Sequence, residues 1–273
     1  MFKEVLENVK RKKPLIHNIT NYVTVNDCAN IILASKGSPI MADEEEEVID
    51  ITSICDGLNI NIGTLNSRTI NSMLLAGKQA NKLNHPVVLD AVGVGASTLR
   101  SNTAIKLINE IQFSVIKGNI SEIKALAISS NNTKGVDASI EDMINNNNLD
   151  EIICLIKEFS CRVKAIIVVS GPIDIVSDGK DTYCIYNGHE MMSSITGTGC
   201  QLSALITTLI SANKNNLLSA TVVAVCMMGY AGEIAYQRLN ELDGNVSYRN
   251  YIIDAIYRMD GKMLDLGAKY EHR

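Results

Sequence analysis

The sequence has no tryptophan and only three phenylalanines, and aromatic residues make up 4% of it. Its formal net charge at pH 7 is −5, and no stretch forms a basic stripe. A nucleic-acid-binding surface needs basic side chains to hold phosphates and aromatic rings to stack on bases. Because both are missing, we expect no nucleic-acid partner and favour a small molecule or a protein.

The seven cysteines include no Cys-x-x-Cys pair and no Cys/His cluster with the spacing of zinc ligands. Such cysteines fit free thiols in a reducing compartment. Residues 1–13 are charged rather than apolar, and the longest apolar run, near residues 222–231, is too short to span a bilayer. We therefore expect a cytoplasmic protein that has no membrane segment.

Two nucleotide-binding signatures are also missing. The sequence has no P-loop motif, and Gly93 and Gly95 lack the rest of a dinucleotide fingerprint. No linker rich in Pro or Ser divides the chain, and 46% of its residues are hydrophobic. We predict a single domain over residues 1–273 with a sizeable core.

What the sequence does contain is an alternation of apolar strands with helices. Buried apolar runs are typical of a parallel sheet, and the turn signal Asp178-Gly179 predicts a hairpin at the sheet edge. The prediction is an α/β fold with a mostly parallel central sheet, helices on both faces and a ligand site along the carboxyl ends of the strands. Strands are expected in the first part of the stretch 14–26 and at 38–42, 57–64, 86–90, 113–119, 161–171, 173–177 and 182–187. Helices are expected at 2–10, 26–35, 66–81, 101–111, 200–212, 217–237 and 248–266.

The segment TGTGC, residues 196–200, is a glycine-bearing turn directly before the predicted helix 200–212. Apolar residues recur along one face of that helix, so we expect this face to pack on the core and the first turn to face outward. The first turn presents free N–H groups and the positive end of the helix dipole, and glycines let an anion approach closely. The motif indicates a phosphate or oxyanion site, although a tight turn without a ligand remains an alternative. The residues that would form the site are Gly197, Thr198, Gly199 and Cys200.

Polar side chains follow two neighbouring strands. Asp90 ends one of them, where it could hold a cation or a substrate hydroxyl, or simply close the loop. Asn119 and Glu122 lie on one face of a first helical turn and could reach toward a metal-bound phosphate. The same spacing fits a capping box. Lys117, just before them, is a possible phosphate or nucleotide contact.

The stretch 14–26 combines apolar and polar residues, so it predicts a strand that leads into a polar loop. Its side chains, including Asn18 and Asn21, would lie where ligands of open α/β sheets bind, but they also fit Asx-turns and a helix cap. His17 fits a hydrogen-bonded structural histidine better than a catalytic base. Met41 could line an apolar pocket wall, although a core filler is the usual role of a methionine.

These parts together indicate a reaction class. A helix N-terminus that binds anions, an acidic metal-binding pair and a strand-end aspartate are used together in phosphoryl transfer. A phosphotransferase is therefore the expected enzyme.

Seven motifs, in order, resemble those of the hydroxyethylthiazole kinases of thiamine salvage, a family of the ribokinase-like superfamily. They are LIHNITN (15–21), SPIMA (38–42), NIGTL (61–65), LDAVGVGA (89–96), IKGNISEI (116–123), KGVD (134–137) and TGTGC (196–200). The resemblance covers nearly the whole chain and implies a ribokinase-like three-layer α/β/α fold. It also implies ATP-dependent phosphorylation of the alcohol of 4-methyl-5-(2-hydroxyethyl)thiazole with Mg²⁺, in a homotrimer whose thiazole sites lie between subunits.

The resemblance also assigns roles to individual residues. It implies that the thiazole pocket is lined by Asn21, Val23 and Met41, and that Gly197 contacts the substrate. It implies ATP contacts by Lys117 and Ser170.

For the phosphates, the resemblance implies that Asp90, Glu122 and Asn119 organise Mg²⁺. The N–H groups of residues 197–200 would stabilise the transferring phosphoryl group, and Cys200 stands where a base for the alcohol is expected.

This chain departs from many family members in having Ala91 where Pro is common and Lys117 where Arg is common. Lysine keeps the positive charge but loses the planar guanidinium fork. A helix N-terminus can lower the pKa of a thiol, so we expect a useful thiolate fraction at Cys200 near neutral pH. Even so, a loose phosphoryl-transfer transition state needs little early deprotonation.

Three alternatives remain. A hydroxymethylpyrimidine or sugar kinase, or an ATP-dependent hydrate dehydratase, could use the same fold. A non-catalytic thiazole- or nucleotide-binding protein could keep the same pocket, but it would not need Asp90, Asn119 and Glu122. The motifs around Asn21 and Met41 favour the thiazole.

Overall fold

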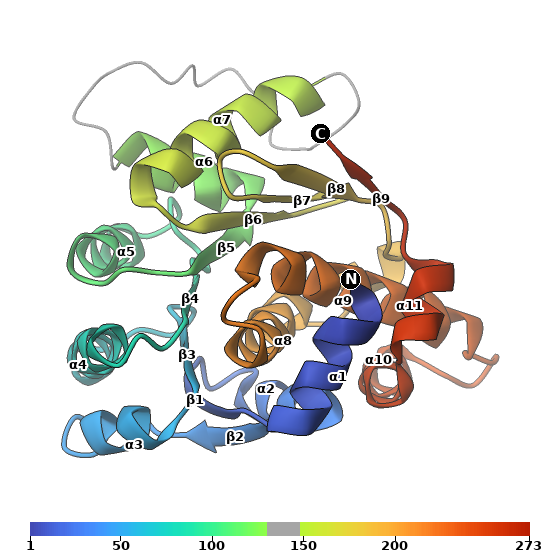
Figure 1. Ribbon diagram of the computed structural model, residues 1–273, viewed down its shortest axis with the longest axis horizontal. Helices are drawn as coiled ribbons and strands as arrows, with labels where there is room; N and C mark the ends of the chain where they lie inside the picture. Colours follow the sequence, from blue (N-terminus) through green and yellow to red (C-terminus); the bar gives the residue numbers. More distant parts are fainter. Residues whose placement is uncertain (130–147) are drawn as a thin grey trace.

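The computed structural model describes residues 1–129 and 148–273, so the KGVD motif at 134–137 lies outside the described residues. The described residues form one nine-stranded sheet, shown in Figure 1. Its strands are β1 (Leu15–Ile19), β2 (Ser38–Met41), β3 (Gly57–Asn61), β4 (Val87–Asp90), β5 (Val115–Asn119), β6 (Ile166–Ser170), β7 (Asp174–Ser177), β8 (Thr182–Ile185) and β9 (Tyr270–His272). Their order is β2-β1-β3-β4-β5-β6-β7-β8-β9; pairing is parallel from β2 to β6 and antiparallel from β6 to β9.

Helices cover both faces of the sheet. They are α1 (Phe2–Lys12), α2 (Val25–Ala34), α3 (Val48–Ile54), α4 (Ser67–Lys82), α5 (Thr98–Glu110), α6 (Ile120–Ser129), α7 (Leu149–Val163), α8 (Thr198–Ala212), α9 (Leu217–Gln237), α10 (Asn245–Arg258) and α11 (Gly261–Gly267), with a 3₁₀ helix η1 (Glu190–Ser194). In Figure 1, α3 to α7 flank one face, and α8 lies against the other with α1, α2 and α9 to α11 around it. The predicted three-layer α/β/α fold with a mostly parallel sheet is confirmed.

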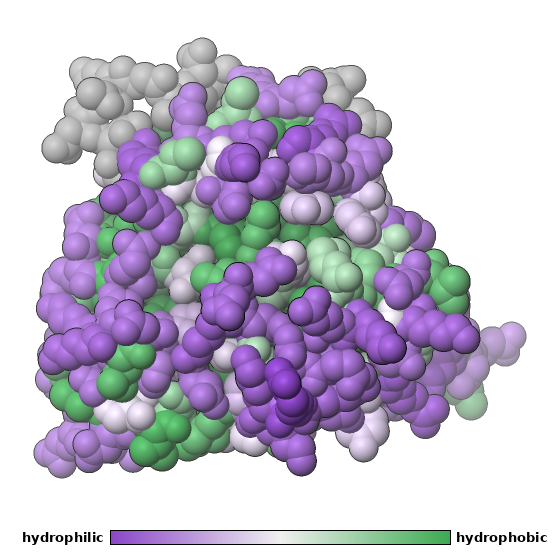
Figure 2. All heavy atoms as spheres, viewed as in Figure 1, coloured by the Kyte–Doolittle hydropathy of each residue, from purple (hydrophilic) through white to green (hydrophobic). Residues whose placement is uncertain are grey.

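Two hydrophobic clusters hold these layers together. Because successive strand residues face opposite sides of a sheet, Val88 and Val168 pack with α8 and α9, whereas Leu89 and Val169 pack with the helices of the opposite face. The central strands are therefore buried on both sides, as their near-continuous apolar runs predict. On the face shown in Figure 2, hydrophilic side chains predominate, and hydrophobic ones gather in a hollow near the middle and in smaller patches.

Helices α8 and α9 are core helices. Every residue of α8 from Cys200 to Ala212 is buried, so the expectation that only one face packs on the core was wrong. The sheet covers one side of α8, and α1, α2 and α9 cover the others. Helix α9 is long and apolar enough to cross a membrane, but 67% of its most apolar window is buried inside the fold.

Two predicted element boundaries and the predicted sheet edge were wrong. Residues 161–163 belong to α7, which ends at the left-handed residue Lys164 (φ 53°), so the strand expected from 161 begins at Ile166. The helix expected over 248–266 is two helices, because the Asp260 side chain accepts a hydrogen bond from the Met263 N–H and starts α11. The predicted hairpin is present as β7 and β8, but β9 pairs beyond it and forms the sheet edge.

Candidate active site

Three neighbouring strand residues lie side by side under the first turn of α8: the last residues of β3 and β4 and the middle residue of β5. Asn61 of β3 is in register with Asp90 of β4, which is in register with Lys117 of β5. Parallel strands bring their carboxyl ends to one edge of the sheet. These three residues therefore lie next to one another in register, although they are far apart in the sequence. All three are buried.

A hydrogen-bond network joins these residues to Cys200. The Asn61 Nδ2 donates to Asp90 Oδ2 (2.6 Å) and lies 3.2 Å from the Cys200 Sγ. The Asn21 Nδ2 donates to Asn61 Oδ1 (3.0 Å) and lies 3.2 Å from the same sulfur. The Lys117 Nζ donates to Asp90 Oδ1 at 3.1 Å. The predicted site residues Asn21, Asp90, Lys117 and Cys200 are thus brought together, with Asn61 at their centre.

The Asp90–Lys117 ion pair is buried: Asp90 is 0% exposed and Lys117 4%. Burial disfavours the charged ammonium, but the negative charges of Asp90 and Glu122 outweigh it and raise the pKa of Lys117 above its usual value. Lys117 therefore stays protonated and supplies a permanent positive charge under α8.

The Cys200 thiol behaves differently from the expectation. Burial raises the pKa of Cys200, and the Asp90 carboxylate raises it further, against the Lys117 ammonium and hydrogen bonds from Thr24 and Asn21, which lower it. The expected thiolate fraction at neutral pH was therefore wrong, because desolvation of a charged sulfur outweighs the nearby positive groups. The thiol is therefore protonated at neutral pH.

Two glycines shape the turn before α8. Gly197 has φ 87°, and a Cβ there would collide with Thr24. A Cβ at Gly199 would lie 2.7 Å from the Lys117 Nζ, so the missing side chain lets the ammonium approach the first turn. Residues 197–199 are partly exposed, unlike the rest of α8. The free N–H groups, the helix dipole and a lysine charge therefore converge on one accessible place, which is the geometry of an anion site.

Asn119 and Glu122 form the capping box that was one of their two interpretations. The Asn119 N–H donates to Glu122 Oε2 (2.8 Å), and the Glu122 N–H donates to Asn119 Oδ1 (2.9 Å). The Gly93 N–H donates to the other Glu122 oxygen at 2.7 Å. Across residues 1–129 and 148–273, no three His, Cys, Asp or Glu side chains are grouped so as to hold a metal. A magnesium role for Asp90, Asn119 and Glu122 stays a prediction.

The N-terminal candidates separate into structural and accessible residues. His17 is fully buried between the Thr52 hydroxyl and the Ala42 carbonyl oxygen, each 2.9 Å away, which confirms the structural interpretation. Burial also lowers the pKa of His17. Met41 ends β2, in register with Asn18, and is half-buried. Val23 is 56% exposed just before α2. Neither Met41 nor Val23 belongs to the hydrogen-bond network.

A pocket of about 650 Å³ opens beside the anion site. Ser170, Thr198 and Gly199 line one part of it, and Met192 and Met228 line another. Asp174 also faces this pocket; burial raises its pKa to about 7, against a hydrogen bond from the Gly171 N–H and the charge of Lys117. The predicted ATP contact Ser170 is thus placed next to the predicted anion site.

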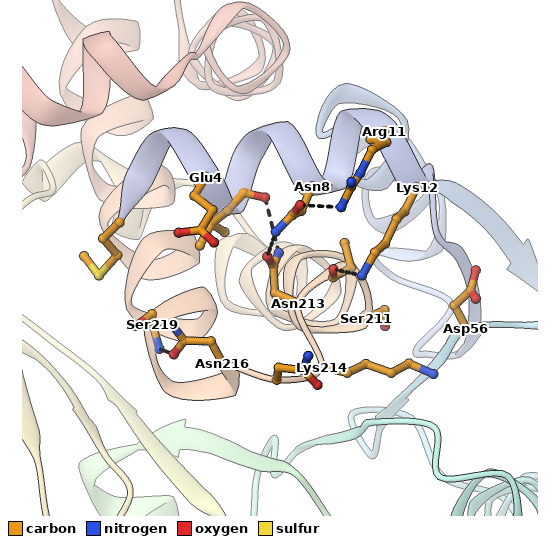
Figure 3. A pocket seen from close by; sticks show the side chains of 14 residues that line it. Glu4, Asn8, Arg11, Lys12, Asp56, Ser211, Asn213, Lys214, Asn216 and Ser219 are labelled. Carbon is orange, nitrogen blue, oxygen red and sulfur yellow. Dashed lines mark hydrogen bonds between the residues drawn. The ribbon is translucent and has the colours of Figure 1, made fainter.

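A slightly larger pocket, of about 730 Å³, lies between α1 and the end of α8 (Figure 3). Its polar groups bind one another: Asn8 donates to Asn213 Oδ1 (2.8 Å), and Lys12 donates to the Ala212 carbonyl oxygen (2.5 Å). None of the predicted site residues lines it. These bonds dock α1 onto the end of α8, which is a structural role.

Asn61 was the main residue that sequence reasoning missed. It belongs to the NIGTL motif, but no role was assigned to it. A usable signal was present, because a carboxamide ends a buried strand beside the strand that ends in Asp90.

The fold is a ribokinase-like α/β fold, and the predicted anion site lies at a helix N-terminus beside the carboxyl ends of its strands. A ribokinase-like superfamily protein from Enterococcus faecalis V583 shares this fold, with a TM-score of 0.64 at 11% identity over 96% of each chain. A model of the hydroxyethylthiazole kinase family matches residues 6–262. The chain belongs to the hydroxyethylthiazole kinase family.

Two relatives show how close this membership is. A hydroxyethylthiazole kinase from Clostridium acetobutylicum is 59% identical over 271 residues, which is 99% of each chain. The structure of a hydroxyethylthiazole kinase from Pyrococcus horikoshii OT3 has a TM-score of 0.88 at 34% identity, covering 99% of this chain and 98% of its own. The family predicted from the seven motifs is confirmed.

Proposed function

We propose that this protein transfers the γ-phosphoryl group of ATP to the hydroxyl of 4-methyl-5-(2-hydroxyethyl)thiazole. The observation that carries the proposal is the network of Asn21, Asn61, Asp90 and Lys117 around Cys200, under the first turn of α8 and beside the 650 Å³ pocket. An anion site next to a pocket of this size suits a nucleotide whose phosphates end at a helix N-terminus.

ATP would occupy the pocket with its phosphates toward Thr198 and Gly199. Ser170 at the end of β6 would contact it there. Lys117 would stabilise the charge of the phosphates from the sheet side of the first turn of α8, because its ammonium lies next to Gly199 and is almost fully buried. A desolvated charge held at a fixed distance stabilises developing negative charge without reorganising during the reaction.

The thiazole would bind near Asn21, Val23, Met41 and Gly197. Val23 and its neighbour Tyr22 are 56% and 78% exposed, so two adjacent apolar side chains beside the proposed site are open to contact. We infer that a neighbouring subunit covers them in a homotrimer and completes the pocket. Light scattering on the pure protein tests this: Tyr22→Glu should lower the assembly mass and raise the KM for the alcohol, whereas a wild-type monomer with full activity would contradict it.

Mg²⁺ would neutralise charge on the ATP phosphates. Both Asp90 oxygens already accept hydrogen bonds, and each Glu122 oxygen accepts one backbone N–H. A carboxylate oxygen has a second acceptor site, so Glu122, which is half-buried, and the exposed Asn119 fit an ion held mainly by phosphates and water. Asp90 would orient the site through Lys117 and Asn61.

Cys200 would not remove the alcohol proton at the start of the reaction, since its thiol is already protonated. A loose transition state lets the alcohol keep its proton until the phosphoryl group has largely transferred. Positioning and charge stabilisation by the first turn of α8 would supply most of the rate.

We also propose that residues 1–273 act as one cytoplasmic domain. One sheet carries every strand-end residue of the site, and all seven cysteines are free.

The test is an assay of the pure protein with ATP, Mg²⁺ and three alcohols: the hydroxyethylthiazole, a hydroxymethylpyrimidine and a sugar. We expect ADP and a phosphate ester of the thiazole. Phosphate on the pyrimidine or the sugar alone would overturn the substrate assignment, and binding of the thiazole without turnover would favour a binding protein.

A further inference from the structure

The Arg100 guanidinium lies at the rim of the proposed active site. Arg100 is in the first turn of α5, and its Nη2 donates to the Gly63 carbonyl oxygen at 2.6 Å. Gly93 has φ 75°, and a Cβ at this residue would collide with the guanidinium. The head group therefore lies between the loops that follow β3 and β4, and it is there because Gly93 leaves the space.

These two loops border the two halves of the site. A Cβ at Gly63 would be 2.9 Å from the Asn61 Oδ1 and 3.2 Å from Asn21, which belong to the network around Cys200. The Gly93 N–H donates to Glu122, on the side proposed for the phosphates. Arg100 thus stands between the substrate side and the phosphate side of the site.

The charge of Arg100 has no acidic partner among the residues that the structure describes. The guanidinium is partly buried, and within residues 1–129 and 148–273 only one of its five N–H groups has a hydrogen-bond acceptor. Some arginines on this molecule do pair with carboxylates, as Arg68 does with Glu44 and Arg238 with Asp254. A partly desolvated cation with free donors favours an anion from outside the chain.

We propose that Arg100 binds the phosphate that the alcohol receives. The inference rests on the proposed function, which supplies a phosphate monoester at this place. A guanidinium fork binds two oxygens of such a group, and from this rim it faces the phosphoryl group opposite Lys117 and the first turn of α8. The group in transfer is thereby held between two cations that come from different faces of the sheet.

The test compares two ligands by calorimetry: the thiazole alcohol and its phosphate ester, prepared chemically. Arg100→Gln should bind the ester about 10- to 100-fold more weakly than wild type and the alcohol within about threefold. Arg100→Lys should lie between, because it keeps the charge without the fork. Lys106→Gln, an exposed charge removed from the same helix, is the matched control and should change neither affinity.

The outcomes separate a phosphate-binding residue from a clamp that only ties two loops together. Unchanged ester affinity in Arg100→Gln would overturn the inference. Equal loss for alcohol and ester in both Arg100 variants would show a structural clamp and would also overturn it. Both outcomes would leave the proposed function intact if the wild-type protein phosphorylates the alcohol. Failure of the wild-type protein to phosphorylate it would overturn the proposed function itself.

Discussion

At the scale of single residues, Asn61 orders the site. Its amide group donates to Asp90 and contacts Cys200, and its carbonyl oxygen accepts from Asn21 Nδ2 (3.0 Å) and the Gly63 N–H (2.9 Å). Removing a side chain with this many partners leaves several buried polar groups unpaired. Asn61 therefore fixes the Asp90 carboxylate and the Cys200 thiol with respect to one another.

We predict that Asn61→Ala lowers kcat by about 10- to 100-fold and the free energy of unfolding by about 1–3 kcal/mol, since the Asp90 oxygen and the Asn21 amide lose their partner. Steady-state kinetics and urea unfolding measure the two effects. Asn59→Ala is the matched control on the same face of β3, because Asn59 bonds Asn18 and not the site. Asn59→Ala should lower stability and leave kcat unchanged. A wild-type kcat in Asn61→Ala would contradict the positioning role of Asn61.

Cys200 gives a second prediction at this scale. Because burial and Asp90 raise the pKa of its thiol, the rate between pH 6 and 8 should not follow a thiolate titration. Cys200→Ala should keep residual activity with the same pH profile, and Cys200→Asp should stay active. Complete loss of turnover in a folded Cys200→Asp protein that still binds substrate would show that the thiol is indispensable.

At the scale of elements, the position of the Lys117 ammonium under the N-terminus of α8 depends on the absence of a side chain at Gly199. A Cβ at Gly199 would lie 2.7 Å from the Lys117 Nζ. We predict that Gly199→Ala displaces the ammonium and lowers kcat by about 10- to 100-fold, with less than about 1 kcal/mol lost in stability, because a helical alanine is itself favourable.

Gly244, before α10, is the control, since a Cβ there would meet nothing within 4 Å. Gly244→Ala should keep both kcat and stability. If Gly199→Ala also left kcat unchanged, Lys117 would not act through the first turn of α8.

Element boundaries show what local patterns miss. The apolar residues Cys161 and Val163 read as the start of a strand, yet they complete the last turn of α7 before Lys164 adopts a left-handed conformation. Short apolar runs fit a buried helix end as well as a strand. Asp260 divides α10 from α11 with an N-cap bond that a helical periodicity does not reveal.

At the scale of the whole molecule, buried thiols link stability to alkaline pH. Burial raises the pKa of Cys28 and of Cys226 to about 12 from an ordinary value of 9.0. Between those values the unfolded chain releases protons that the folded chain keeps, so the unfolded state is favoured as pH rises. From pH 8 to 10 we predict a loss of about 1.4 kcal/mol in the free energy of unfolding for each of the two thiols.

Urea unfolding at the two pH values measures this loss. Cys55 and other buried thiols with raised pKa values add to the difference, so Cys226→Ala should remove only its own share, about 1.4 kcal/mol, although it lowers stability at both pH values. Cys154→Ala, which changes an exposed thiol, should remove none of it. An equal pH dependence in Cys226→Ala and wild type would show that the buried thiols do not cause the effect.

The sequence by itself determined the layered parallel fold, the order of its main elements, the family and the strand end at Asp90. These follow from apolar periodicity, turn residues and motif order, which are properties of neighbouring residues. Only the tertiary structure decided that the Asn61 amide meets a sulfur 139 residues away, that Lys117 turns inward to Asp90, and that the Cys200 thiol stays protonated. Contacts and pKa values of this kind depend on burial and on how α8 packs against the strand ends, and no local pattern specifies either.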